Sequence, residues 1–426
     1  MRPARLLALS ALSAALVLGL TGCGSGGGDP ARAEGGGPAT ISYGIWDKNQ
    51  APAMQKIIDE FRTANPDITV KLQVTPYKQY WTTLQTAATG GGAPDVFWMN
   101  GPNIKLYAGN GQLLPLDGTI KDGGLNLADY PASLVDLYTW DGKTYGIPKD
   151  FDTIGVWYNK SLFDAAGVEH PTDDWTWADF QATARKLTDP AKGIYGAAAP
   201  VENQAGYYDT IHSAGGEIIS ADGAASGYGS PEALQGIEFW TSLVKDGASP
   251  TVQQMTDTSP YDMFKAGKIA MLWNGSWAAG EYHGIAELKD TVDVVRIPAG
   301  PKGSISVIHG LGNVVYAKTK HPEAAQKFLS FLGTRRAAEI QAETGAVIPA
   351  FNGTQQKWVD AMPQFNLKAY IDEVPDAAAY PVSKETKTWN TLETEILTKV
   401  WTGEVDAATG LKDLATQMDA ALAKEQ

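Results

Sequence analysis

The chain carries ISYGIW at residues 41–46, ITVKLQV at residues 68–74 and DVFWM at residues 95–99. These apolar segments are rich in β-branched and aromatic residues, which predicts strands. Two helical patterns separate them, at residues 52–64, where apolar side chains recur at helical spacing, and at residues 77–88, which a run of three glycines ends. Strands that alternate with helices in this way predict an α/β fold with parallel strands.

The same alternation continues to the end of the chain. We expect further strands at residues 153–158, 268–273 and 313–317. We expect further helices at residues 177–187, 231–246, 321–343 with a break at Gly333, 384–401 and 405–422. With 426 residues in the chain and about 150 residues per domain, we expect two or three domains.

The composition is that of an ordinary globular protein. Hydrophobic residues make up 43% and charged residues 19%, which excludes a disordered, collagen-like or coiled-coil chain. The 34 Lys and Arg against 48 Asp and Glu give a formal net charge of −14. This acidic balance argues against nucleic acid as a partner, because phosphates are neutralised by clustered Lys and Arg. The 13 tryptophans are heavy use of that residue, and a binding groove would account for part of it.

The N-terminus has the pattern of an export signal. A basic stretch at residues 1–5 is followed by residues 6–20 without a charge, which fits a signal peptide and falls short of the roughly 20 residues of a membrane span. Residues 20–23 (LTGC) then resemble the bacterial lipobox, in which cleavage before the cysteine exposes it for lipid attachment. We therefore expect a lipoprotein signal peptide over residues 1–22 and a lipid on Cys23, with an ordinary secretory cleavage site as the alternative.

Cys23 is the only cysteine, so no internal disulfide can form. Cleavage before it would leave 426 − 22 = 404 residues. Residues 24–40 are rich in glycine and lack apolar periodicity. We expect residues 23–40 to be the lipidated cysteine followed by a flexible tether.

The sequence carries no recognisable motif for catalysis, metal binding or a cofactor. The five histidines do not have the spacing of metal ligands, and there is no G-x-S-x-G elbow, P-loop or complete dinucleotide fingerprint. We expect no cofactor and no metal. A glycoside hydrolase would need two carboxylates facing one bond. Asp150 and Asp152 are the candidate pair, and a partner further along the chain is the other possibility, so this alternative stays open.

Six segments carry a family resemblance together, in order along the chain. They are FRTANPDITVKLQV (61–74), YKQYWTTLQTAATGGGAPDVFWMNG (77–101), GIPKDFDTIGVWYNKSLFDAAG (146–167), FKAGKIAMLWNGSWAAG (264–280), HGLGNVVYAKTKHPEAAQKFLSFL (309–332) and ETGAVIPAF (343–351). They resemble the bacterial extracellular solute-binding proteins of the maltose-binding-protein-like group, which are lipoprotein substrate-binding subunits of ABC sugar importers.

This resemblance implies a two-lobed α/β fold of the type II periplasmic-binding-protein kind, with three crossings and a ligand cleft between the lobes. The implied first lobe is made of residues 41–149 and 299–350, and the second of residues 150–298 and 351–426. The implied function is to bind a carbohydrate, a di- or oligosaccharide, and to deliver it to an ABC permease. The protein would work as a monomer on the extracellular face of the cell membrane, held there by its lipid.

The resemblance also points to ligand-binding residues in the second lobe. Trp277, which follows Asn274 at a strand-to-helix turn, matches the family's stacking tryptophan, with a core position as the alternative. Trp389, near a helix start, matches another stacking tryptophan. Asp152 falls where the maltose binders carry an acidic sugar contact, and Asp150, two residues away, is the alternative for that role.

The first lobe offers polar and aromatic residues at the ends of its first and third strands. Trp46, Asp47 and Lys48 follow the first strand, and Trp98 and Asn100 end the third. Ligands of open α/β sheets bind at the carboxyl ends of the strands. The alternatives are a helix-capping role for Asp47 and a core position for Trp98.

Aromatic faces stack on the C–H patches of sugar rings, and planar polar side chains pair with hydroxyl groups. Trp81 and Tyr208 are further aromatic candidates, each with a core position as the alternative. Gly310 would let the backbone approach a ligand closely, with a tight turn as the alternative. Other tryptophans lie within apolar patterns and are expected in the core: Trp157, Trp240, Trp273 and Trp401.

Two other functions compete with sugar import. A surface-anchored glycoside hydrolase or lyase would turn over an oligosaccharide, and Asp152→Asn would abolish that turnover. An adhesive lipoprotein with no small ligand would show no thermal stabilisation by any sugar, whereas a binding protein is stabilised by its ligand.

Overall fold

The computed structural model describes residues 38–425, and the expected signal peptide, Cys23 and most of the expected tether lie outside them. One sheet has five strands in the order β2 (Ile68–Val74), β1 (Ala39–Ile45), β3 (Val96–Met99), β13 (Gly312–Val315) and β6 (Gly146–Pro148). The strands β1, β2 and β3 are parallel, as the opening segments predict, whereas β13 runs antiparallel to β3 and β6. The helices that accompany this sheet are α1 (Ala51–Ala64), α2 (Tyr77–Gly90), α3 (Gly101–Gly109), α4 (Asp117–Asp122), α5 (Ala132–Leu137), α13 (Pro322–Leu332) and α14 (Arg335–Glu343).

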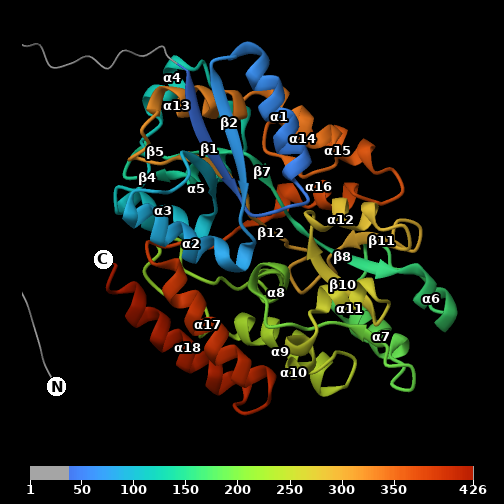
Figure 1. The fold of residues 1–426 in the computed structure, drawn as a ribbon. Coiled ribbons are helices and arrows are strands. Elements are labelled where there is room, and N and C mark those ends of the chain that lie inside the picture. Colours follow the sequence, from blue (N-terminus) through green and yellow to red (C-terminus); the bar gives the residue numbers. More distant parts are fainter. Residues whose placement is uncertain (1–37, 426) are drawn as a thin grey trace, which may run out of the picture. The chain divides into compact units, whose positions relative to one another are not determined.

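A second sheet has the order β11 (Val292–Arg296), β8 (Ile154–Asn159), β10 (Ile269–Gly275) and β9 (Tyr195–Ala197). Figure 1 shows the two sheets as the centres of two groups of elements. The helices of the second group are α6 (Lys160–Ala166), α7 (Trp177–Leu187), α8 (Tyr208–Ala214), α9 (Pro231–Lys245), α10 (Val252–Asp257), α11 (Pro260–Lys265), α12 (Ala278–Gly284), α16 (Lys368–Asp372), α17 (Thr386–Trp401) and α18 (Ala407–Leu422).

The chain passes between the two sheets three times, as expected. The first passage runs from β6 to β8 and includes β7 (Asp150–Phe151), and the second runs from β11 to β13 and includes β12 (Val307–Ile308). The third lies between α13, which packs on β13 and β1, and α16, which packs on β11 and β8. Short strands tie the passages together, since β7 pairs with β14 (Ile348–Pro349) and β12 pairs with β15 (Ala378–Ala379). The expected lobe boundaries stay a prediction.

Local signals explain where the helices begin. In α7, the Thr176 hydroxyl accepts from the N–H of Asp179, whose carboxylate in turn accepts from the N–H of Thr176, which is a capping box. At α9 the Ser230 hydroxyl accepts from the N–H of Ala233, and Pro231 occupies the first turn. The helix expected at residues 321–343 is interrupted at Gly333, as predicted, and Thr334 caps α14.

Apolar side chains form three clusters. The largest runs from the first sheet, where it includes Tyr43 and Trp98, to one face of the second, where it includes Trp157. The other two cover the remaining face of each sheet. The expected core positions are confirmed, because the exposed fractions of four tryptophans lie between 0% and 3%: Trp157, Trp240, Trp273 and Trp401. Within residues 38–425, no helix is both long and apolar enough to cross a membrane.

Candidate ligand-binding cleft

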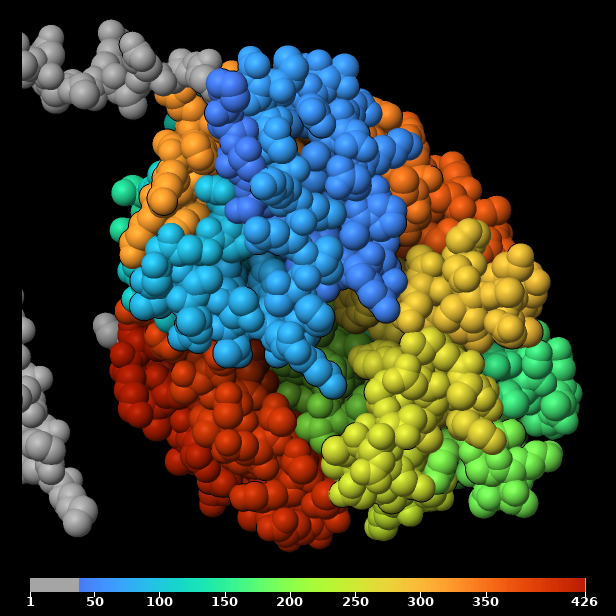
Figure 2. Space-filling model, in the orientation of Figure 1, coloured from blue at the N-terminus to red at the C-terminus, as the bar shows by residue number. Residues whose placement is uncertain are grey.

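The surface is hollowed where the two groups of elements meet. Figure 2 shows this hollow between the blue segment that contains α2, the yellow segment around α10 and α11, and the red segment of α17, with green residues near α8 at its floor. The carboxyl ends of β1, β3 and β10 and the segment after β9 supply the polar and aromatic residues described below. We call this hollow the cleft.

Aromatic residues form the wall that belongs to the first sheet. Trp46 follows β1, and its ring centroid lies 5.7 Å from that of Tyr77 and 5.6 Å from that of Trp81. Tyr77 is 54% exposed, yet burial raises the pKa of its hydroxyl and the charge of Glu202, in the second group, raises it further. Tyr77 therefore lies at the edge of the hollow, packed against Trp46 on one side and open to solvent on the other. The Trp81 indole N–H lies near Tyr77 but makes no hydrogen bond within the described residues.

The polar residues after β1 are held locally. The Asp47 carboxylate accepts from the backbone N–H of Asn49 at 2.8 Å and from Nε2 of Gln50 at 3.0 Å. These bonds hold the turn before α1 and are not a helix cap, because Gln50 is the N-cap residue of α1 and no side chain caps that helix. A carboxylate oxygen can accept more than one hydrogen bond. Lys48 is exposed. Asn100 precedes α3, is 5% exposed and accepts from Nδ2 of Asn103 at 2.8 Å.

Trp98 is fully buried and contacts a buried ion pair. The Lys149 ammonium lies 4.3 Å from the Trp98 ring centroid, 2.5 Å from the Asp150 carboxylate and 2.8 Å from Oε1 of Gln50. Asp150 also accepts from the backbone N–H of Leu311 at 2.9 Å. In this structure Trp98 and Asp150 therefore belong to a network beneath the cleft that joins the first and second passages, and neither has a free face.

Asp152 and its neighbours form the wall on the other side. Asp152 is half-buried and accepts from Nε2 of Gln204. Burial, followed by the charge of Asp150, raises its pKa well above the usual range. Burial also raises the pKa of Glu202 to about 7, and Nδ2 of Asn203 donates to the Tyr380 hydroxyl at 3.1 Å.

Trp277 lies at the turn between β10 and α12. It is half-buried and packs on both of the apolar clusters that meet at the second sheet. Its ring lies directly over Gly275, where an added Cβ would come within 2.0 Å of the ring. Only glycine fits beneath the indole, so this contact fixes the orientation of the ring. Asn274, just before it, is 3% exposed and donates to the Tyr282 hydroxyl at 3.2 Å.

Three other predicted residues are buried and make close contacts within the protein. Trp389 is fully buried and donates to the Ser383 hydroxyl at 2.9 Å. Tyr208 is also fully buried, with its hydroxyl 2.9 Å from the Glu393 carboxylate. A Cβ at Gly310 would come within 2.4 Å of the Asp150 carbonyl oxygen, so this glycine permits a backbone-to-backbone approach. None of these placements tests a ligand contact, and the three roles stay predictions.

The cleft residues that sequence reasoning missed are Tyr77, Glu202, Asn203, Gln204 and Tyr380. The segment Glu202–Gln204 comes shortly after β9, so the rule that ligands lie at carboxyl ends of strands would have found it. Tyr380 follows β15, a strand of two residues that has no signal in the sequence.

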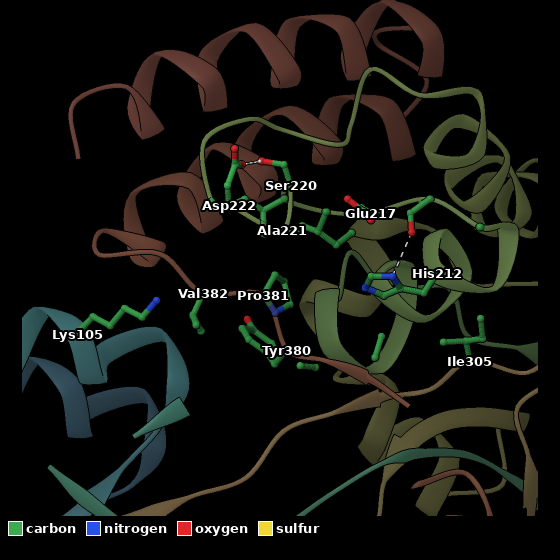
Figure 3. Close-up of a pocket in the computed structure, with 17 residues that line it drawn as sticks. Lys105, His212, Glu217, Ser220, Ala221, Asp222, Ile305, Tyr380, Pro381 and Val382 are labelled. Carbon is green, nitrogen blue, oxygen red and sulfur yellow. Dashed lines mark hydrogen bonds between the residues drawn. The ribbon is translucent and has the colours of Figure 1, made fainter. Parts of the chain in front are cut away.

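A separate cavity of about 590 Å³ lies outside this set of residues. Figure 3 shows Lys105 at one end and His212 at the other, with Tyr380 and Val382 between them. His212 bonds the Gly216 carbonyl oxygen through Nδ1 at 3.1 Å, and burial lowers its pKa. Apart from Tyr380, the cavity contains none of the cleft residues named above. Within residues 38–425, no group of three or more His, Cys, Asp or Glu side chains is placed to hold a metal ion.

Comparison with known proteins places the chain in a family. Residues 47–339 match the family model described as bacterial extracellular solute-binding protein. An ABC substrate-binding protein from Listeria monocytogenes, solved in complex with cycloalternan, is 30% identical with a TM-score of 0.84 over 90% of this chain and 99% of that one. The GacH receptor of Streptomyces glaucescens is 23% identical, has a TM-score of 0.81 over 91% of this chain and 99% of its own, and supports the two-lobed fold.

Sequence relatives agree with this assignment. The maltodextrin-binding protein of Bacillus subtilis is 27% identical over 96% of this chain and 93% of its own length. The galactooligosaccharide-binding protein of the same organism is 25% identical over 82% of both chains. The family consists of binding proteins, so nothing supports the alternative of a glycoside hydrolase or lyase. The chain belongs to the bacterial extracellular solute-binding protein family.

Proposed function

We propose that this protein binds a carbohydrate of two or more units in the cleft and delivers it to the membrane subunits of an ABC importer. The observation that carries the proposal is the pairing of aromatic rings with hydrogen-bonding groups on both walls. Trp46 and Tyr77 lie on one wall, and Trp277, Gln204 and Glu202 on the other. Aromatic faces cover the apolar patches of sugar rings, while amides and carboxylates pair with the hydroxyl groups.

Delivery to a permease and attachment to the membrane belong to the same proposal. Two-lobed binding proteins close about a hinge when they bind, and the closed form differs in surface from the open one. We propose that a lipid on Cys23 holds the protein at the extracellular face of the membrane and that the protein acts as a monomer. The lipobox-like residues 20–23 and the glycine-rich residues 24–40 support the anchor and the tether.

A thermal-shift screen of residues 38–426 over mono-, di- and oligosaccharides tests the proposed function. A ligand that binds only the folded state stabilises it by RT ln(1 + [L]/Kd). We expect one class of carbohydrate to raise the melting temperature in proportion to the logarithm of its concentration, with amino acids and dipeptides as controls. A melting temperature that no carbohydrate changes at millimolar concentration would refute the proposal.

A further inference from the structure

A groove of about 600 Å³ lies next to the cleft, between α2 and α3 of the first group and α17 of the second. Figure 1 shows α2 and α3 above α17 in the view, and α3 contacts α17. Trp81 lines the groove and also contacts Trp46 in the cleft, so the two spaces share this side chain. The volume lies within the range of about 300–1,000 Å³ that small-molecule sites occupy.

Two polar groups in the groove lack partners among the described residues, and one of them is fully buried. The Tyr107 side chain, on α3, is 6% exposed, and its hydroxyl, which is not one of the fully buried atoms, has no hydrogen-bond partner within residues 38–425. Burial raises its pKa to about 12, so the hydroxyl keeps its proton and is available as a donor. Oε1 of Gln112 is buried and also has no partner among the described residues. A buried polar atom without a hydrogen bond is costly, and such atoms in a pocket are expected to meet a ligand or ordered water.

The rest of the lining has one acidic and one basic residue, Glu385 and Lys387, among neutral side chains that can form hydrogen bonds. The polar residues that line it include Gln85, Thr89, Asn103, Thr388 and Thr391. The charges of Glu385 and Lys387 are opposite in sign, so the lining does not favour an ion of one sign, and hydroxyl and amide groups around one indole suit the hydroxyls and the apolar face of a sugar ring. A ligand in the groove would touch helices from both groups and so favour the closed arrangement.

We propose that this groove is a subsite for further units of the carbohydrate bound in the cleft, and that Tyr107 and Gln112 set a preference for longer oligosaccharides. The proposal rests on the proposed function. The ligand passes Trp81, and the units beyond it donate to the Gln112 oxygen and accept from the Tyr107 hydroxyl. The preferred ligand therefore has at least three units.

Calorimetric titration with malto-, isomalto-, cello- and xylo-oligosaccharides of one to six units tests this. In the series that binds, we expect affinity to rise at least about tenfold from the disaccharide to the longest member, because each added unit gains contacts. Tyr107→Phe and Gln112→Met should each remove most of this gain while they leave the affinity for the disaccharide within about twofold. Tyr145→Phe is the matched control, because Tyr145 is 8% exposed in the same apolar cluster and does not line the groove.

The outcomes separate the two proposals. Binding that is equally tight for disaccharides and longer chains would overturn the subsite and leave the cleft intact. The subsite is also overturned, with the cleft left intact, if Tyr107→Phe weakens the binding of oligosaccharides of every length equally. The same conclusion follows if Tyr145→Phe loses as much affinity for the longer chains as Tyr107→Phe does. Failure of every carbohydrate to bind the unmodified protein would overturn both proposals together.

Discussion

Glu393 should make the folded protein less stable as the pH rises through the neutral range. Its carboxylate is fully buried beneath the floor of the cleft and faces the hydroxyls of Tyr207, Tyr208 and Tyr228 at 3.3, 2.9 and 2.5 Å. Nδ2 of Asn390 donates to it at 2.9 Å. Burial outweighs these hydrogen bonds and raises the pKa of Glu393 from 4.5 to about 7.

The size and sign of the effect follow from this shift. The folded state holds the proton more tightly than the unfolded chain does, so the stability is complete below pH 4.5 and falls between pH 4.5 and about 7. At about 1.36 kcal/mol per pKa unit, ionisation of Glu393 lowers the free energy of unfolding by about 3 kcal/mol above pH 7. Glu393→Gln keeps the shape and most hydrogen bonds but cannot ionise.

Guanidinium unfolding at pH 5, 6, 7 and 8 measures the difference between the two proteins. We expect Glu393→Gln to match the parent protein at pH 5 within about 1 kcal/mol and to be about 3 kcal/mol more stable at pH 8. Burial also raises the pKa of Glu373, to about 8, so the parent's own slope has other contributors and the difference between variants is the informative quantity. Glu395→Gln, at an exposed position of α17, is the control. The quantity to compare is the free energy of unfolding of Glu393→Gln minus that of the parent protein. A smaller value of this difference at pH 8 than at pH 5 would refute the reasoning.

Trp277→Ala should weaken carbohydrate binding at least about tenfold in calorimetry, since it removes a stacking face that Gly275 orients, and unchanged affinity would put the ligand elsewhere. Lys149→Met should lower the free energy of unfolding by about 3–5 kcal/mol in guanidinium, because the buried charge of Asp150 loses its partner. A loss below about 1 kcal/mol would contradict a stabilising role for this ion pair. Cys23→Ala in the full-length chain should move the protein from the membrane fraction to the medium, and an unchanged distribution would contradict the lipid anchor.

Local patterns were enough to find the main strands and helices. The strand at residues 68–74 and the helix at residues 177–187 have the predicted limits. Both are long, strongly patterned segments whose ends carry capping or breaking residues. A local pattern does not show which strands pair with one another. The neighbours of the antiparallel strand β13 in the sheet, β3 and β6, lie far from it in sequence, so its place in the sheet could not be predicted.

Burial of single tryptophans was harder to predict. Trp389 is the fourth residue of α17 and has polar neighbours in the sequence. A helical pattern shows which residues share a face without showing what covers that face. In the structure Ser383 accepts its indole N–H and the second apolar cluster encloses the ring. The position of Gln204 after β9 made it a candidate under the rule about strand ends, but its contact with Asp152, 52 residues away, is visible only in the structure.

The positions of Trp46 and Trp98 show how the rule about strand ends should be applied. Trp98 is the third of the four residues of β3, so its side chain is part of the sheet and is packed between Tyr43 and Lys149. Trp46 comes just after the last residue of β1, where the backbone has left the sheet and the ring can lean toward α2. Asn100 and Trp277 likewise lie just beyond β3 and β10. Residues just after the end of a strand are therefore the better candidates for ligand contact. Residues that are still within the strand, such as Trp98, belong to the core.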